Sequence, residues 1–229
     1  MAVFEPYRYF GLAYRVGRWS RLRVGLFLSK VGEVIGSSWL TYNPLHFYSF
    51  HEHAVENSPG VISSISSLFP EHTRWVDVGA GSGAFAKEAA ENGKIVMALE
   101  NSKAGRRIGR KIGVDMRPFD LLLNEPPVAN SKYELAYCFE VAEHLSPDLG
   151  DKLIDFLVDN SETIVFTAAV PGQRGTGHIN EQPKEYWIQR FVERGAVYKP
   201  DQSGKLSQMF KEKEVASWFV RNVIVFTTI

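Results

Sequence analysis

The sequence has a single cysteine, Cys138, inside the apolar run 133–139. One cysteine cannot close an internal disulfide, so we expect Cys138 to pack as a small buried hydrophobic side chain. The sequence also lacks an excess of either charge, because 26 Lys and Arg residues balance 26 Asp and Glu residues. This balance argues against a generally basic nucleic-acid-binding protein, and we do not expect a nucleic-acid partner.

Long hydrophobic runs are missing as well. Basic residues interrupt the segment 1–40, which therefore offers neither the apolar core of a signal peptide nor a membrane span. We accordingly expect a soluble cytoplasmic protein. Its 229 residues are 45% hydrophobic and 13% aromatic, enough for one packed domain with an appendage.

A glycine-rich stretch follows a short β-rich run at residues 75–78. Glycine permits positive φ and lets a ligand approach where a Cβ would block it, and the N–H groups of a helix starting at Ala84 would face that ligand. The stretch predicts a nucleotide-like cofactor site at the carboxyl end of a strand. Its candidate cofactor-binding residues are Asp77, Gly79, Ala80, Gly81 and Gly83.

An acidic residue ends the next apolar run, 95–99. Glu100 is placed where a carboxylate can accept hydrogen bonds from both hydroxyls of a ribose. Asp77 stands where an NAD-binding domain usually has an apolar residue. Together these residues resemble the class I S-adenosylmethionine (SAM) methyltransferases over roughly residues 72–228, and the resemblance implies SAM as cofactor.

Strands and helices alternate along the rest of the chain, which is typical of a doubly wound α/β parallel sheet. The resemblance implies seven strands with an antiparallel last strand, a SAM-binding domain over 58–229, and an N-terminal helical extension or lid over 1–57. We expect strands at 74–78, 95–100, 117–120, 133–139, 163–168, 196–199 and 222–228, and helices at 84–91, 103–111, 147–160, 184–194 and 205–218.

Two residues after the third predicted strand are further cofactor candidates. In the resembling family an acid here accepts a hydrogen bond from the adenine amine, and its apolar neighbour packs on the ring. This implies Asp120 and Leu121. The alternative is a surface aspartate in a turn.

The stretch 140–144, Glu-Val-Ala-Glu-His, resembles the Glu-Val-x-Glu-His signature of ubiquinone-type O-methyltransferases and small-RNA 3′-terminal methyltransferases. One helical turn is expected to bring Glu140, Glu143 and His144 to a common edge. The resemblance implies a divalent cation there. Alternatively, Glu140 binds the cofactor and His144 is a general base for an acceptor hydroxyl. The third option is that this stretch only begins a helix and that His144 has a structural role.

The loop 171–183 is long, polar and glycine-rich, and such loops in compact domains are usually functional. We predict that His178 faces the acceptor and that Glu143, His144 and His178 are the catalytic residues, although His178 could also stabilise the loop. The wider motif of the small-RNA 3′-terminal methyltransferases, including its second histidine, is missing from this region. A hydroxyl of a small metabolite or sugar is therefore the preferred acceptor, and an RNA end is the lesser one.

The N-terminal segment differs from the rest, because residues 1–32 hold six basic residues and one acidic residue among many aromatics. Residues 1–36 could contact a membrane surface or hold an anionic acceptor. We favour a helical extension that packs on the domain, although its glycines weaken any long helix. Residues 39–53 are predicted as a turn-rich lid rather than a metal site, and Ser58-Pro59-Gly60 is expected to break the chain before a helix at 61–68.

Two other functional classes remain open. The glycine pattern also fits an NAD(P) oxidoreductase, but no hydride-transfer set such as Tyr-x-x-x-Lys stands at the expected place. A non-catalytic module with the same fold could use its basic N-terminal segment to bind a membrane or partner. Nothing in the sequence sets an oligomeric state.

Overall fold

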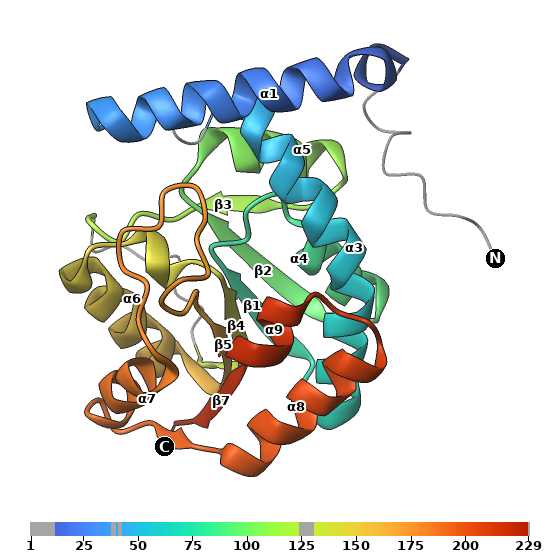
Figure 1. The fold of residues 1–229 in the computed structure, drawn as a ribbon. Helices are drawn as coiled ribbons and strands as arrows, with labels where there is room; N and C mark the ends of the chain where they lie inside the picture. Colours follow the sequence, from blue (N-terminus) through green and yellow to red (C-terminus); the bar gives the residue numbers. More distant parts are fainter. Residues whose placement is uncertain (1–11, 38–39, 41–42, 124–130, 229) are drawn as a thin grey trace.

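The computed structural model describes residues 12–37, 40, 43–123 and 131–228. Seven described strands form one sheet in the order β3-β2-β1-β4-β5-β7-β6 (Figure 1). Strands β1 to β5 are parallel, and β7 is antiparallel to β5 and β6. The predicted doubly wound α/β sheet with an antiparallel last strand is confirmed. The strands are β1 (Arg74–Val78), β2 (Ile95–Glu100), β3 (Met116–Pro118), β4 (Tyr133–Phe139), β5 (Ser161–Thr167), β6 (Val197–Tyr198) and β7 (Ile224–Thr227).

Helices cover both faces of this sheet (Figure 1). They are α1 (Leu12–Ile35), α3 (Pro44–Leu68), α4 (Ala84–Glu91), α5 (Lys103–Lys111), α6 (Pro147–Asn160), α7 (Lys184–Val192), α8 (Pro200–Glu212) and α9 (Ser217–Asn222), with a 3₁₀ turn η2 (Ala142–His144). The predicted bounds of α4, α5 and α6 are correct. The predicted helix 205–218 is wrong, because α8 ends before Glu214, which has a φ of 55°, and α9 begins separately.

The central strands are buried on both faces, as expected for a parallel sheet covered by helices. Successive side chains of β4 alternate between two cores. Leu135 and Tyr137 pack with α3 and α8, whereas Ala136 and Cys138 pack with α6 and α7. Cys138 is a fully buried free thiol, as predicted.

Helix α3 contradicts the expected break at Ser58-Pro59-Gly60, because it continues through Pro59. An internal proline costs a helix roughly 3 kcal/mol. Burial of Val61, Ile62 and Ile65 in the core outweighs that cost. Gly60 assists, because a Cβ there would lie 2.6 Å from Val215 on the turn between α8 and α9. Residues 44–53, expected to be turn-rich, therefore form the first turns of a long helix.

The start of α3 projects beyond the carboxyl edge of the sheet, where α1 packs across it (Figure 1). The Asn43 side-chain amide, just before α3, donates to the Gly25 carbonyl at 3.0 Å and contacts the Ser29 hydroxyl at 3.1 Å. The glycines of α1 do not interrupt it over Leu12–Ile35. Among the described helices, none is both long and apolar enough to cross a bilayer.

Candidate cofactor and acceptor site

The glycine-rich loop between β1 and α4 adopts left-handed backbone at all three glycines. Gly79, Gly81 and Gly83 have φ values of 76°, 54° and 78°. The N–H groups of Gly79 and Ala80 both donate to the Leu99 carbonyl at 2.9 Å, which ties the loop to the end of β2. A Cβ on Gly81 would meet no atom of the described residues within 4 Å. The loop therefore leaves open space beside its backbone, as a ligand held against it would need.

Close packing fixes the loop from two sides. A Cβ on Gly79 would lie 2.4 Å from the Val141 side chain, which follows β4. A Cβ on Gly105 would lie 2.3 Å from the Gly81 carbonyl oxygen, so only glycine lets α5 approach this closely. Gly105 was not predicted as a site residue, because the only sign of its role in the sequence is its position early in a basic helix.

Glu100 faces the glycine loop from the end of β2. Its Oε2 accepts a hydrogen bond from the Gly81 N–H at 2.7 Å, and its Oε1 accepts one from the Ser102 N–H at 2.5 Å. Burial raises the pKa of this carboxyl to about 7, although both N–H groups act in the opposite direction. The structure thus places Glu100 beside the glycine loop, and its predicted binding of a ribose stays a prediction.

Asp77 lies inside β1 and pairs across the sheet with Tyr137 of β4. It is buried, and burial raises its pKa well above the usual range, an effect to which the charge of Glu100 adds. Asp77 therefore lies in the buried sheet two residues before Gly79, at the start of the loop. The predicted contact of Asp77 with cofactor stays untested.

A histidine from α3 binds the loop, a contact that the sequence did not predict. His51 Nδ1 lies 2.9 Å from the Ser82 hydroxyl, and both side chains are buried. Burial lowers the pKa of His51 to about 4, so its ring is neutral at physiological pH. His53, considered with it in the sequence, does not reach the loop: 60% of its side chain is exposed, and its ring meets Trp218 of α9 edge to face.

Asp120 and Leu121 follow β3 in a turn at the same edge of the sheet. The Asp120 Oδ1 accepts a hydrogen bond from the Leu122 N–H at 2.9 Å, as an aspartate that stabilises a turn does. Leu121 is half-buried against the core. Their predicted adenine contacts remain predictions.

Glu140 does not join its neighbours through a helical turn, and that expectation is wrong. Its backbone is left-handed, with a φ of 53°, and the following turn is the short η2. Its Oε2 accepts from the Gln173 amide at 2.6 Å and its Oε1 from the Asn222 amide at 3.3 Å. Left-handed backbone costs a non-glycine residue about 1–2 kcal/mol, and such strain is characteristic of functional sites. Glu140 therefore links β4 to the loop after β5 and to α9.

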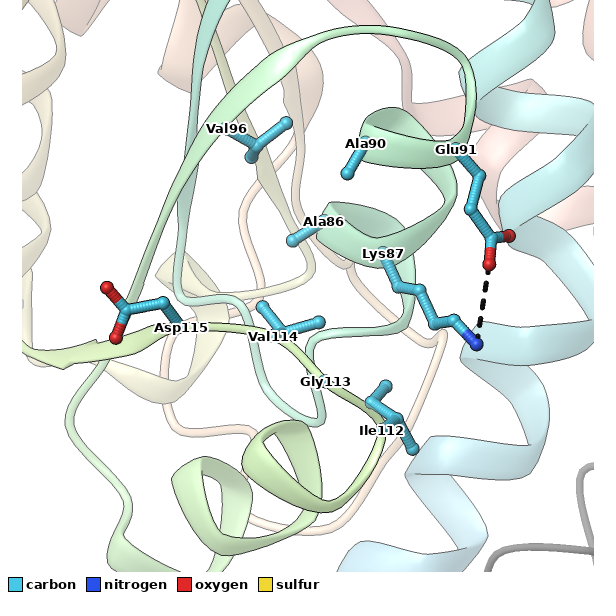
Figure 2. A pocket seen from close by; sticks show the side chains of 9 residues that line it. All are labelled: Ala86, Lys87, Ala90, Glu91, Val96, Ile112, Gly113, Val114 and Asp115. Atoms are coloured by element: carbon cyan, nitrogen blue, oxygen red, sulfur yellow. Dashed lines mark ion pairs between the residues drawn. The ribbon is translucent and has the colours of Figure 1, made fainter.

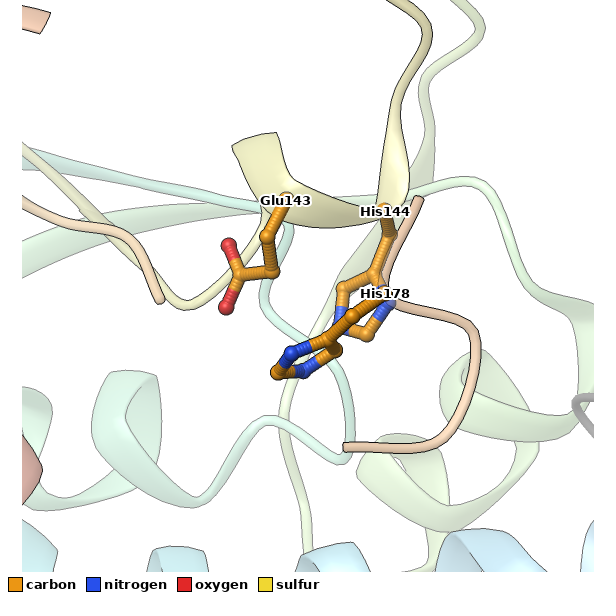
Figure 3. Close-up of side chains that lie close together, drawn as sticks. All are labelled: Glu143, His144 and His178. Atoms are coloured by element: carbon orange, nitrogen blue, oxygen red, sulfur yellow. The ribbon is translucent and has the colours of Figure 1, made fainter. Parts of the chain in front are cut away.

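The three predicted catalytic residues do lie together (Figure 3). One ligand atom each from Glu143, His144 and His178 lies within 4.8 Å of the other two. The two imidazole rings meet edge to face, with centroids 4.9 Å apart. Glu143 and His144 come from η2, and His178 comes from the loop after β5. The loop is held to η2 because the Ile179 and Asn180 N–H groups donate to the Glu143 carbonyl at 2.9 and 3.0 Å.

Hydrogen bonds fix which ring nitrogen of each histidine is protonated. His144 Nδ1 lies 3.1 Å from the Gly177 carbonyl, and His178 Nδ1 lies 2.8 Å from Glu181 Oε1. Carbonyl and carboxylate oxygens only accept, so both Nδ1 atoms donate, and each neutral ring keeps its lone pair on Nε2. Burial would raise the pKa of Glu181, but His178 and the N–H groups of Gly172 and Arg174 lower it overall.

Glu143 is fully buried, and within the described residues neither of its carboxyl oxygens is at hydrogen-bonding distance and angle from a partner, although the Ala169 N–H and the Glu140 side chain are near enough to act on its pKa. Burial and the nearby charge of Glu140 raise its pKa well above the usual range. A buried carboxyl without a partner costs about 1–3 kcal/mol or more. Such a group holds its proton or acquires a partner from a ligand, which marks the cluster as a candidate acceptor site. Gly175 leaves room for the His178 ring in this cluster, because a Cβ on Gly175 would lie 2.2 Å from His178 Nε2.

A pocket of about 340 Å³ lies elsewhere, between α4 and the turn before β3 (Figure 2). Lys87 and Glu91 form an ion pair of 3.4 Å among its lining residues. None of the predicted site residues lines this pocket, so the pocket is separate from the candidate site. Its lining residues are Ala86, Lys87, Ala90, Glu91, Val96, Ile112, Gly113, Val114 and Asp115.

A family model described as a methyltransferase domain matches residues 51–212 of this chain. A search of curated proteins finds no match. The family match spans the glycine loop, Glu100 and the Glu143 cluster. It favours the methyltransferase interpretation over the NAD(P) alternative.

Solved structures share the fold at low sequence identity. DesVI from Streptomyces venezuelae has a TM-score of 0.59 and 12% identity, covering 80% of this chain and 97% of that chain. SAM-bound CalS10 from Micromonospora echinaspora, an amino pentose methyltransferase involved in calicheamicin biosynthesis, has a TM-score of 0.55 and 16% identity, covering 74% and 89%. SAM-bound magnesium protoporphyrin IX methyltransferase from Synechocystis PCC 6803 has a TM-score of 0.54 and 14% identity, covering 75% and 79%.

Proposed function

Because this chain belongs to the methyltransferase-domain family of class I SAM-dependent enzymes, we propose that it methylates a hydroxyl group of a small metabolite or sugar. The orientation of His144 and His178 carries this proposal, since both rings keep a lone pair on Nε2. A hydroxyl acceptor must lose a proton during methyl transfer, and imidazole is the side chain best suited to take it near neutral pH. The sugar option draws on CalS10, which acts on an amino pentose.

The residues of the glycine loop fit SAM. Gly81 leaves open space beside its backbone, and Glu100 offers a carboxylate to a ribose at the same place. SAM supplies a methyl group that is already activated as a sulfonium. The chain therefore has to align the acceptor and remove its proton, and alignment alone can be worth roughly 7–11 kcal/mol.

The proposed roles follow from the positions of the side chains. Glu100 holds the ribose, Asp120 and Leu121 contact the adenine, and Glu140 lies at the cofactor end of the acceptor site. One of His144 and His178 takes the acceptor proton. Glu143 stays protonated, because burial and the nearby Glu140 raise its pKa, and it donates a hydrogen bond to the acceptor.

The test is release of S-adenosylhomocysteine on pools of small hydroxylated acceptors, with the wild type and the His144→Ala and His178→Ala variants. Loss of the general base lowers kcat by about 10²–10⁴-fold. Binding of SAM, measured by isothermal titration calorimetry, is expected to stay unchanged in both variants. Full activity of both variants contradicts the proposal.

A second candidate reaction uses a divalent cation at Glu143, His144 and His178. The 4.8 Å spacing of their ligand atoms favours it, as do the hydrogen bonds that orient each ring through Nδ1. An RNA 3′ end would then be a further acceptor. Chelation followed by addition of Mg²⁺, Mn²⁺ or Zn²⁺ separates the two reactions, because activity that survives chelation excludes the cation.

A further inference from the structure

Helix α1 turns small residues toward the body of the protein. Gly25, Ser29 and Gly32 are spaced four and three residues apart, so they share one helical face, and all three are buried. Asn43 donates to the Gly25 carbonyl at 3.0 Å and contacts the Ser29 hydroxyl at 3.1 Å on this face. The small side chains let the backbone of α1 lie close to the start of α3.

The large apolar side chains of the same helix point outward. Phe27 and Val34 are seven residues apart and lie opposite the buried face. A helix that only covered a soluble domain would bury such residues, as amphipathic surface helices do. The exposed apolar residues form what we call the outer face of α1. Their exposed fractions are 49% for Val24, 44% for Leu26, 67% for Phe27, 87% for Val34 and 62% for Ile35.

The charge of α1 is also unlike that of the whole chain. The sequence 12–35 contains five basic residues and one acidic residue, whereas the 229 residues together are neutral. Lys30 is exposed one turn from both Phe27 and Val34. Arg23 is exposed on the same side, so the outward side of α1 carries basic residues among its apolar ones. Such a surface matches a helix that lies in the headgroup region of a membrane and attracts anionic lipids.

We infer that the outer face of α1 binds the surface of an anionic lipid bilayer. A second copy of the chain is the poorer occupant, because two α1 helices facing each other would bring their positive charges together. Helix α1 lies across one end of the molecule (Figure 1), and its outer-face side chains are exposed among the described residues. This inference goes beyond the proposed reaction and does not depend on it.

The test is co-sedimentation of the full chain with vesicles of phosphatidylcholine alone or with 30% phosphatidylglycerol. We expect binding to the anionic vesicles that weakens at high salt. Phe27→Ser/Val34→Ser should reduce the partition coefficient more than about tenfold. Lys30→Gln should reduce it about fivefold on anionic vesicles only.

The matched control is Ile95→Ser/Val192→Ser, which removes two exposed apolar side chains away from α1 and should bind as the wild type does. Circular dichroism and SAM titration confirm that each variant is folded, so a failure here is distinct from a failure of the proposed reaction. Two results overturn the inference. One is equal sedimentation of wild type and Phe27→Ser/Val34→Ser. The other is a dimer in sedimentation velocity that this variant converts to monomer.

Discussion

At the scale of single residues, we expect the protonation state of Glu100 to affect cofactor binding, because its carboxyl group lies beside the glycine loop. Its pKa is about 7, and the carboxylate form accepts hydrogen bonds from both ribose hydroxyls more strongly than the protonated form, in which one oxygen becomes a donor. We expect the affinity for SAM to rise as the pH increases from 6 to 8. Isothermal titration calorimetry across this range measures it.

The matched variant is Glu100→Gln, which keeps the size of the side chain and removes its titration. It should bind SAM weakly, with an affinity that is flat over the same range. A wild-type affinity that is independent of pH between 6 and 8 would show that Glu100 does not bind the ribose as a carboxylate.

Alanine variants of Gly81 and Gly93 distinguish a glycine that a ligand site requires from a glycine that only a turn requires. Both have positive φ, and a Cβ on either would meet no atom within 4 Å. Alanine at either position should cost about 1–2 kcal/mol of unfolding free energy. Gly81→Ala should also abolish SAM binding, because its methyl group fills the space beside the loop, whereas Gly93→Ala should bind normally. Equal dissociation constants for the two variants contradict this assignment.

The sequence allowed the glycines and Glu100 to be predicted because each requirement is local to a strand and the turn after it. His51, Gln173 and Asn222 could not be predicted in the same way. His51 reaches Ser82 from 31 residues away, and Asn222 reaches Glu140 from 82 residues away. Only the packing of α3 and α9 against the sheet brings His51 and Asn222 to the site, where Gln173 arrives on the loop after β5.

At the scale of elements, α3 is joined to the glycine loop through one buried hydrogen bond. We expect His51→Ala and Ser82→Ala each to lower the free energy of unfolding by about 1–3 kcal/mol, because each leaves a buried partner unsatisfied. The double variant should lose less than the sum, with a coupling energy of about 0.5–3 kcal/mol. Urea denaturation of the four proteins gives this cycle. Additive losses would mean that the contact does not join the two elements.

The elements of the sheet were predictable because their signal is repeated along the chain. Runs of apolar residues bounded by turn residues located β1, β2 and β4, and α6 was found within its observed bounds. The predictions were wrong where contacts between distant segments outweighed a local sequence signal. Pro59 suggested a break, but the buried residues after it hold α3 together. At Glu140 the helical spacing suggested one turn, but hydrogen bonds from Gln173 and Asn222 accompany a left-handed backbone.

At the scale of the whole molecule, the candidate site and α1 lie toward the same end. The glycine loop and Glu100 follow the carboxyl ends of β1 and β2, and the start of α3 carries α1 beyond that edge (Figure 1). Binding of the outer face of α1 to a bilayer would therefore turn the candidate site toward the lipid headgroups. If the proposed reaction is correct, the acceptor would be met at the membrane surface.

The stability of the whole molecule should depend on pH through two buried groups with opposite effects. The pKa of His51 is about 4, against 6.5 for a histidine in the unfolded chain, so the unfolded chain binds more protons between these values and stability rises with pH. The pKa of Glu100 is about 7 against 4.5, so the folded protein binds more protons and stability falls as pH rises. Each effect amounts to about 3 kcal/mol, and the two largely cancel between pH 4.5 and 6.5.

Single variants should reveal each component. In His51→Gln the free energy of unfolding should fall as the pH rises from 4.5 to 6.5, and in Glu100→Gln it should rise relative to the wild type. Asp77 and Glu143, whose pKa values burial also raises, are present in all three proteins, so differences between the urea profiles isolate His51 and Glu100. Parallel profiles for all three proteins would mean that neither buried group changes its pKa on folding.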